Sequence, residues 1–315
     1  MGKQHTAPDE QIQELLKLTE NSISTIILGK HQQIQLALSC LLAGGHLLIE
    51  DLPGVGKTTL SLTLARVFGL DFHRIQFTSD LLPSDVLGVS IYDNTTHSFK
   101  FHQGPVFTQV LLADEINRST PKTQSALLEA MEEQQVTQDG ITRKLPRPFF
   151  VIATQNPMEQ IGTFPLPESQ LDRFLMRINI GYPDPQAEME LLRGRDRHSM
   201  IEQLQTVIPP SQLVEIQQLV ENIHMSDAIL DYILALIRSS RLSPWFLTGL
   251  SPRAGLALQK CARAWALLNG RDHVLPEDIQ QVLPSVAAHR LQIHPEHQDK
   301  NIDELVVMLI QQVPV

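Results

Sequence analysis

The stretch Glu50-Asp51-Leu52-Pro53-Gly54-Val55-Gly56-Lys57-Thr58-Thr59 decides the fold, because it joins an apolar run of strand length to a helical pattern. Glycines let successive backbone N–H groups turn inward at a helix N-terminus, where the helix dipole favours a phosphate. In such a loop the lysine reaches the β and γ phosphates, and the threonine hydroxyl after it binds magnesium. The nucleotide-binding residues that this loop predicts are Pro53, Gly54, Val55, Gly56, Lys57, Thr58 and Thr59.

The loop departs from the strict motif at one position. The spacing G-x-x-x-x-G-K asks for glycine at position 51, where this chain has Asp51. Aspartate tolerates a left-handed backbone better than most residues. The alternative interpretation is a chance glycine-rich turn between a strand and a helix, which the coincidence of Gly54, Gly56, Lys57 and Thr58 disfavours.

A second motif, Val110-Leu111-Leu112-Ala113-Asp114-Glu115, is an apolar strand pattern that ends in two carboxylates. A purely structural strand has no reason to end in this way. In an enzyme with a phosphate-binding loop, we expect Asp114 to hold magnesium through its water shell and Glu115 to polarise the attacking water. Thr58 and Asp114 are therefore the predicted magnesium-holding residues.

A third strand pattern, Phe150 to Thr154, continues into Gln155-Asn156-Pro157. Open α/β sheets bind their ligands at the carboxyl ends of the strands. We expect Asn156 to hydrogen-bond the γ-phosphate or the attacking water at that edge. The alternative is an ordinary Asn-Pro turn.

Apolar runs of strand length alternate with helical patterns through the first 180 residues, which predicts a parallel sheet covered on both faces and an α/β fold. Insertions are expected near residues 87–104 and 136–145, the second a hairpin because Asp139-Gly140 marks its turn. Strand patterns stop after residue 184, so we predict a nucleotide-binding domain at 1–183 and a small helical domain at 184–315. Within the helical domain, Ser251-Pro252 begins one helix and Gly270 follows its end.

The composition is that of a soluble globular protein, with 315 residues, 42% hydrophobic and 19% charged. A formal charge of −10 and a pI near 5.6 make nucleic acid an unlikely partner. Cys40 and Cys261 lack metal-ligand spacing and lie in apolar helical patterns, which is typical of buried reduced thiols. Because the chain also shows neither a secretory signal nor a membrane-spanning run, we expect a cytoplasmic protein.

Further motifs carry a family resemblance. They are the phosphate-binding loop, Asp114 to Arg118, Gln124 to Glu133, Ala153 to Pro157, Gly162 to Glu168, Leu171-Asp172-Arg173-Phe174 and Ser251-Pro252-Arg253-Ala254. Together they resemble the MoxR branch of the AAA+ ATPases over nearly the whole chain. The resemblance implies a P-loop AAA+ core with a five-stranded parallel sheet, followed by a small all-helical lid.

The resemblance also implies residue roles. Asn156 corresponds to the sensor-1 residue, Arg173 to the arginine finger and Arg253 to the sensor-2 arginine. For the finger, Arg118 and Arg177 remain alternatives, although Arg177 alternates with apolar residues on a strand pattern and is expected to be structural.

The function implied is that of a chaperone-like ATPase that converts ATP to ADP and phosphate with Mg2+ and remodels or matures a partner protein. We expect a ring-shaped homo-oligomer, a hexamer, with a von Willebrand factor A domain protein as partner. The two insertions are expected to face its pore. Two other functions stay open: the AAA+ motor of a metal chelatase, and a scaffold that binds nucleotide without hydrolysing it.

Overall fold

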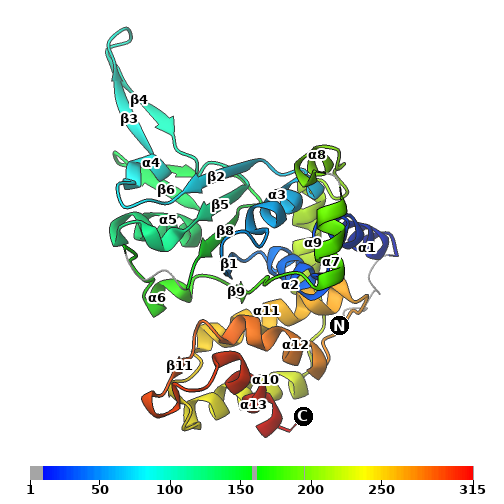
Figure 1. Cartoon of the computed structure of the whole chain (residues 1–315). Coiled ribbons are helices and arrows are strands. Elements are labelled where there is room, and N and C mark those ends of the chain that lie inside the picture. The colour runs from blue at the N-terminus through cyan, green and yellow to red at the C-terminus, as the bar shows by residue number, and fades with distance from the viewer. Residues whose placement is uncertain (1–9, 158–161, 195, 315) are drawn as a thin grey trace, which may run out of the picture.

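This computed structural model describes residues 10–157, 162–194 and 196–314. A five-stranded parallel sheet forms the centre of the described chain. Its strands are β1 (Leu47–Glu50), β2 (Phe72–Gln76), β5 (Val110–Asp114), β8 (Phe150–Gln155) and β9 (Met176–Ile178). Their order is β2-β5-β8-β1-β9 (Figure 1). This confirms the predicted α/β class with a parallel five-stranded core.

The central strands β5 and β8 are buried on both faces of the sheet. Neighbouring side chains of a strand point to opposite faces, so each strand contributes to two apolar cores. Leu47 and Ile49 join one apolar core with α2 (His31–Leu42) and α3 (Lys57–Val67). Leu48 joins a second core with α4 (Pro83–Leu87) and α5 (Pro121–Glu133). The sheet therefore lies between two layers of helices, which fixes the edge where its strands end.

The C-terminal part is helical, as predicted, but it also contains a short antiparallel pair, β10 (Phe246–Thr248) with β11 (Gln292–Ile293). Ser251 caps α11 through a hydrogen bond from Ala254 N–H, with Pro252 as the first helical residue. The helices of the N- and C-terminal parts are α1 (Glu10–Ser24), α6 (Glu168–Leu171), α7 (Pro185–Arg193), α8 (Arg197–Glu202), α9 (Pro210–Asn222), α10 (Asp227–Leu242), α11 (Pro252–Leu268), α12 (Pro276–Ala287) and α13 (Ile302–Gln312), with 3-10 turns at Ile116–Arg118 and Pro295–His297.

Helices from beyond residue 184 share the first apolar core with the sheet. Residues of α9 and α11, among them Leu213 and Leu258, belong to the same buried cluster as Leu47 and α2. Figure 1 shows α10 to α13 gathered at one end of the sheet, while α7, α8 and α9 lie beside it. The division of the chain near residue 184 remains a prediction, since packing continues across it.

Two hairpins project from the core (Figure 1). The predicted insertion near 136–145 is β6 (Gln135–Gln138) paired with β7 (Ile141–Lys144), as its turn residues indicated. The insertion near 87–104 is also a hairpin, β3 (Gly88–Asp93) with β4 (Ser98–Gln103). Among the described residues, no helix has the length and apolar character that crossing a membrane requires.

Candidate nucleotide-binding site

The loop between β1 and α3 has the backbone shape of a phosphate cradle. Gly54 and Gly56 have φ angles of 86° and 94°, a left-handed region that glycine enters without cost. No atom lies within 4 Å of the place where a Cβ would stand at either glycine, so a ligand can approach the backbone closely. Lys57 is buried at the start of α3, and its Nζ donates to the carbonyl oxygen of Asp51 at 2.8 Å.

Asp51 serves this loop in a way that the sequence did not indicate. Its backbone does not enter the left-handed region for which aspartate had been considered. Instead its carboxylate accepts from Leu52 N–H at 2.9 Å and from Gly181 N–H at 2.6 Å. The aspartate therefore fixes the start of the loop to the segment that follows β9.

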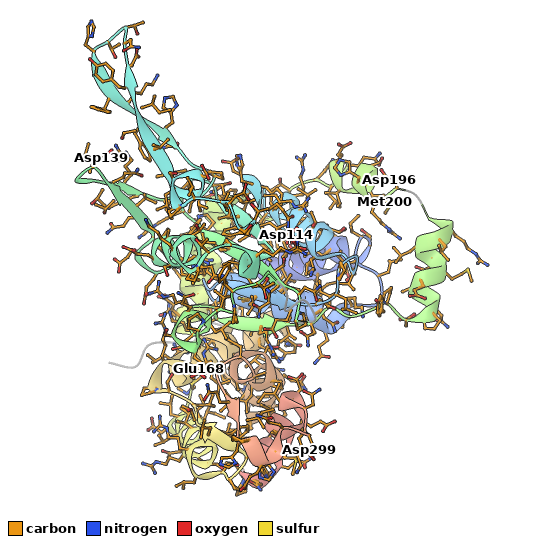
Figure 2. The ribbon with its side chains drawn as sticks, turned by 60° about the vertical axis from the view of Figure 1, so that its left-hand side comes forward. Asp114, Asp139, Glu168, Asp196, Met200 and Asp299 are labelled. Atoms are coloured by element: carbon orange, nitrogen blue, oxygen red, sulfur yellow. The ribbon has the colours of Figure 1, made fainter. Side chains whose placement is uncertain are left out.

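Asp114 lies at the carboxyl end of β5 and is nearly buried (Figure 2). One carboxylate oxygen accepts from Thr154 Oγ1 at 2.6 Å, and the other from Arg74 Nη2 at 2.7 Å. Because both oxygens are held, the side chain has a single orientation. Arg74 and Thr154 were not predicted as site residues.

Glu115 has a φ angle of 56°, which costs a residue with a side chain about 1 to 2 kcal/mol. Its carboxylate accepts from Gln76 Nε2 at 2.7 Å and pairs with Arg118 Nε at 3.0 Å. Glu115 N–H donates to Thr154 Oγ1 at 2.9 Å. A strained backbone held by surrounding contacts is common where a side chain must be aimed at a reacting group.

Asn156 completes this edge of the sheet. It is buried just after β8, and β8 lies between β5, which carries Asp114, and β1, which leads into the loop. The strand order thus brings together the predicted loop residues, both carboxylates and Asn156. The hydroxyl of Thr58 and the carboxylate of Asp114 are hard oxygen ligands of the kind that Mg2+ prefers, so these residues fit a magnesium–nucleotide complex.

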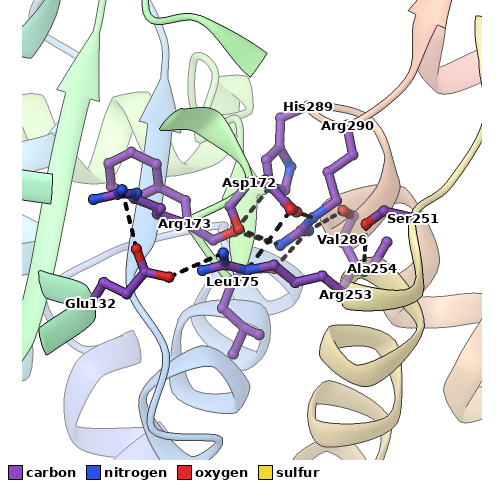
Figure 3. Close-up of polar contacts among 11 residues, drawn as sticks. Glu132, Asp172, Arg173, Leu175, Ser251, Arg253, Ala254, Val286, His289 and Arg290 are labelled. Atoms are coloured by element: carbon purple, nitrogen blue, oxygen red, sulfur yellow. Dashed lines mark hydrogen bonds and ion pairs between the residues drawn. The ribbon is translucent and has the colours of Figure 1, made fainter. Parts of the chain in front are cut away.

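Arg173 and Arg253 belong to a different cluster (Figure 3). Arg173 Nη2 lies 3.1 Å from one carboxylate oxygen of Glu132, at the end of α5, and Arg253 Nη1 lies 3.3 Å from the other. Arg253 Nε is also 3.8 Å from Asp172 Oδ2. These contacts share no residue with those described above for Lys57, Asp114 and Glu115.

The two alternative arginines have structural contacts within the subunit. Arg177 pairs with Glu50 at 2.8 Å and with Asp303 at 3.1 Å, and its side chain is largely buried. Arg118 pairs with Glu115. Arg177 therefore connects β9 to the end of β1 and to α13, as its alternation with apolar residues had indicated.

Arg74 and Gln76 could not be predicted as site residues from the sequence because β2 carries no recognised motif. Both residues are two apart on the strand, and Ile75 between them joins the core of the opposite face. Polar residues that alternate in this way are a signal of a strand with one open face. Only the pairing of β2 with β5, which sets Gln76 opposite Asp114, shows that these polar side chains contact the carboxylates at the end of β5.

Comparison with known proteins agrees with the geometry. Residues 46–176 match the ATPase family associated with various cellular activities (AAA), and residues 238–307 match the AAA lid domain. A crystal structure of a candidate ATPase from Cytophaga hutchinsonii superposes with a TM-score of 0.89 at 38% identity, covering 96% of this chain and 95% of that one.

Curated relatives agree as well. YeaC of Bacillus subtilis is 49% identical over 92% of this chain and 91% of its own length. Chaperone MoxR1 of Mycobacterium tuberculosis is 42% identical over 85% of this chain and 73% of its own. Magnesium-chelatase subunit ChlI of Nicotiana tabacum is more distant, at 27% identity over 59% of this chain and 43% of its own. The AAA and lid matches, together with the extent of the MoxR similarity, show that the chain belongs to the MoxR family of AAA+ ATPases.

Proposed function

We propose that this AAA+ protein hydrolyses ATP in a ring of identical subunits and uses the cycle to remodel or mature a partner protein. The observation that carries the proposal is the meeting of the Lys57 loop, Asp114, Glu115 and Asn156 at the carboxyl edge of one parallel sheet. Ligands of open α/β sheets bind at this edge, where the strand order reverses. Family membership supports nucleotide binding.

Each residue then has a role that follows from its place. The loop N–H groups and Lys57 hold the phosphates, and Thr58 and Asp114 hold magnesium, which when bound offsets the phosphate charge. Glu115, aimed by Gln76 and by its left-handed backbone, takes the attacking water. Asn156 orients that water or the γ-phosphate from the neighbouring strand.

A ring is supported by the separation of the arginines from the loop. Arg173 and Arg253 are paired with Glu132 and not with the groups around Lys57. An arginine finger supplied by a neighbouring subunit contributes about 10³ to 10⁵ in turnover. We therefore assign Arg173 and Arg253 to the nucleotide of the adjacent subunit, in a ring that we take to be a hexamer.

The two hairpins are the proposed contact with the partner protein. Their exposed apolar side chains include Phe99 and Ile91 on β3–β4 and Ile141 on β6–β7. Arg143 of β7 stacks on the Phe101 ring of β4 at 3.9 Å, which joins the hairpins into one surface beside a cavity of about 400 Å³. Exposed apolar surface of this kind favours a protein partner. A von Willebrand factor A domain protein and a cytoplasmic setting complete the proposal.

Two other functions remain testable. A metal-chelatase motor is supported by the similarity to magnesium-chelatase subunits, but the MoxR-named relatives match more of the chain at higher identity. A scaffold that binds nucleotide without hydrolysing it has no use for a strained, aimed Glu115. The intact set of Asp114, Glu115 and Asn156 therefore favours turnover.

The proposal is tested by phosphate release from the purified protein with ATP and Mg2+. Wild type should turn over ATP, whereas Lys57→Ala should lose nucleotide binding because water replaces the loop cation poorly. Arg173→Ala should bind ATP and hydrolyse almost none. In a random equal mixture of the two variants, about one quarter of the head-to-tail interfaces combine an intact loop with an intact finger, so activity should return.

Phosphate release separates an ATPase from a scaffold, and the mixture tests the role of Arg173. A non-hydrolysing scaffold gives no phosphate release above the Lys57→Ala background. If differently tagged chains of the two variants co-purify in one ring and both are folded, but activity does not return, Arg173 does not act on the neighbour. Arg118 or Arg177 would then take its place.

A further inference from the structure

Arg290 is the most fully engaged arginine at the junction between the C-terminal helices and the sheet (Figure 3). It follows α12, and its side chain is only 4% exposed. Its guanidinium donates to Asp172 Oδ1 at 2.6 Å, to the carbonyls of Phe174 at 2.7 Å, Leu175 at 3.2 Å and Asp172 at 3.4 Å, and to that of Val286. These five hydrogen bonds use all five N–H donors of an arginine.

All but one of the acceptors lie in residues 172–175, the short link between α6 and β9. This link contains Arg173, the proposed finger. His289, the residue before Arg290, adds a hydrogen bond between its Nε2 and the carbonyl of Phe174 at 3.0 Å. The residues on both sides of Arg173 are therefore held by the C-terminal helices, while the Arg173 side chain reaches Glu132.

We propose that Arg290 is a positioning residue that aims Arg173 and Arg253 at the nucleotide of the neighbouring subunit, an inference that rests on the proposed trans role of those arginines. Arg290 holds Asp172 Oδ1, and Arg253 lies 3.8 Å from Asp172 Oδ2. Arg173 and Arg253 meet again at Glu132. Asp172 thus links the buried Arg290 to Arg253 through its carboxylate and to Arg173 through the chain, since Arg173 is the next residue.

The expected effect is on turnover and not on nucleotide affinity. Arg290 has no described contact with the phosphate-binding loop, so the KM for ATP should stay unchanged in Arg290→Met. A misplacement of about 1 Å at a reacting centre can cost about a hundredfold, so kcat should fall about 10- to 100-fold. Arg290→Lys keeps the charge but not the planar guanidinium group, so its kcat should fall less.

Mixed rings separate a trans role from every other role. If Arg290 aims the arginines at the neighbour, Arg290→Met has an intact loop and a defective finger. Its activity should rise when it is mixed with Lys57→Ala, which supplies an intact finger. It should gain nothing when it is mixed with Arg173→Ala, because both variants then lack an aimed finger.

The opposite pattern overturns the inference. If Arg290 served the nucleotide of its own subunit, Arg173→Ala would restore activity and Lys57→Ala would not. If neither mixture raises the activity of Arg290→Met, although the tagged chains co-purify in one ring, the positioning role of Arg290 is also rejected. The mixture of Lys57→Ala with Arg173→Ala is the reference. If this mixture regains no activity, the trans role of Arg173 is itself wrong. If it regains activity but the mixture of Lys57→Ala with Arg290→Met does not, only the role of Arg290 is rejected.

Arg271→Met is the matched control. Arg271 also pairs with a buried aspartate of the C-terminal helices, Asp278, but touches neither Asp172 nor residues 173–175. It should lower the melting temperature and leave kcat unchanged. If Arg271→Met lowers kcat and its activity responds to the two mixtures as that of Arg290→Met does, then the stability of the C-terminal helices explains the loss of turnover in Arg290→Met. Should Arg290→Met melt below the assay temperature, Arg290→Lys replaces it in both mixtures with the same expected pattern.

Discussion

His46 shows how one buried residue fixes the core at the start of β1. Val151 N–H donates to its Nδ1 at 3.0 Å, so the ring proton lies on Nε2, which is 3.3 Å from the carbonyl oxygen of Met131. Both nitrogens are satisfied in the neutral form. Desolvation by burial lowers the pKa of His46 to about 4, and burial also lowers the pKa of His289 well below its usual value.

A pH dependence of stability follows at this scale. In the unfolded chain both histidines regain a pKa near 6.5, so the unfolded state takes up protons first as the pH falls. Their stability contribution is complete above pH 6.5 and is lost between pH 6.5 and about 4 for His46. At pH 5 the preferential protonation of unfolded His46 should reduce the free energy of unfolding by about 2 kcal/mol, and His289 contributes in the same direction.

Urea unfolding between pH 7.5 and pH 5 measures this loss. His46→Gln should be less stable at pH 7.5 but should lose about 2 kcal/mol less on acidification than wild type does. An unchanged pH slope in that variant would contradict the neutral, buried state of His46.

At the scale of elements, the hairpin β6–β7 is specified by its turn. Asp139 and Gly140 have φ angles of 54° and 73°, and Gln138 pairs with Ile141 across them. Two central residues with positive φ match the twist of the strands that they join. Figure 2 shows Asp139 at the outer end of this hairpin, away from the core, so the turn has little tertiary support.

Gly140→Ala should therefore destabilise the hairpin locally. A left-handed residue with a side chain costs about 1 kcal/mol, which makes local opening about fivefold more frequent. Hydrogen exchange of the amides in residues 135–144 measures this change. Asp139→Gly removes a side chain at the matched position and should not accelerate exchange. Equal acceleration in both variants would mean that the turn conformation does not set the stability of the hairpin.

At the scale of the whole molecule, the N-terminal and C-terminal parts share one apolar core, so the C-terminal helices cannot shift without disturbing the sheet. The Arg290 contacts and the Arg177–Asp303 ion pair add polar links across the same boundary. In the proposed ring, nucleotide state would then pass between subunits mainly through Arg173 and Arg253, and less through a swing of the C-terminal helices.

Glu115→Gln tests the ring at this scale. The amide keeps the size of the side chain but removes the charge that polarises water, so ATP and Mg2+ should bind while turnover collapses. The ATP-loaded variant should then remain as a larger species in light scattering, whereas Lys57→Ala on its own, without an ATP-binding partner variant, should not form that species with ATP. Normal hydrolysis by Glu115→Gln would move the catalytic role to another residue.

The sequence by itself determined the features that depend on neighbouring residues. Glycines at 54 and 56 permit the loop, the run from Val110 to Asp114 forms a buried strand, Ser251-Pro252 begins a helix, and Asp139-Gly140 makes a hairpin turn. The family resemblance then implied a five-stranded AAA+ core followed by a helical lid. These features are local because backbone conformation and capping depend on residues a few positions apart.

Only the tertiary structure decided which distant side chains serve those features. Arg74 holds Asp114 because β2 pairs with β5, and Asp51 accepts from a residue 130 positions later. Arg290 reaches Asp172 across 118 positions. No periodicity in the sequence encodes such pairs, because strand order and helix packing are chosen by burial of the whole core. That choice places the groups that hold Asp51, Asp114 and Asp172 in their orientations.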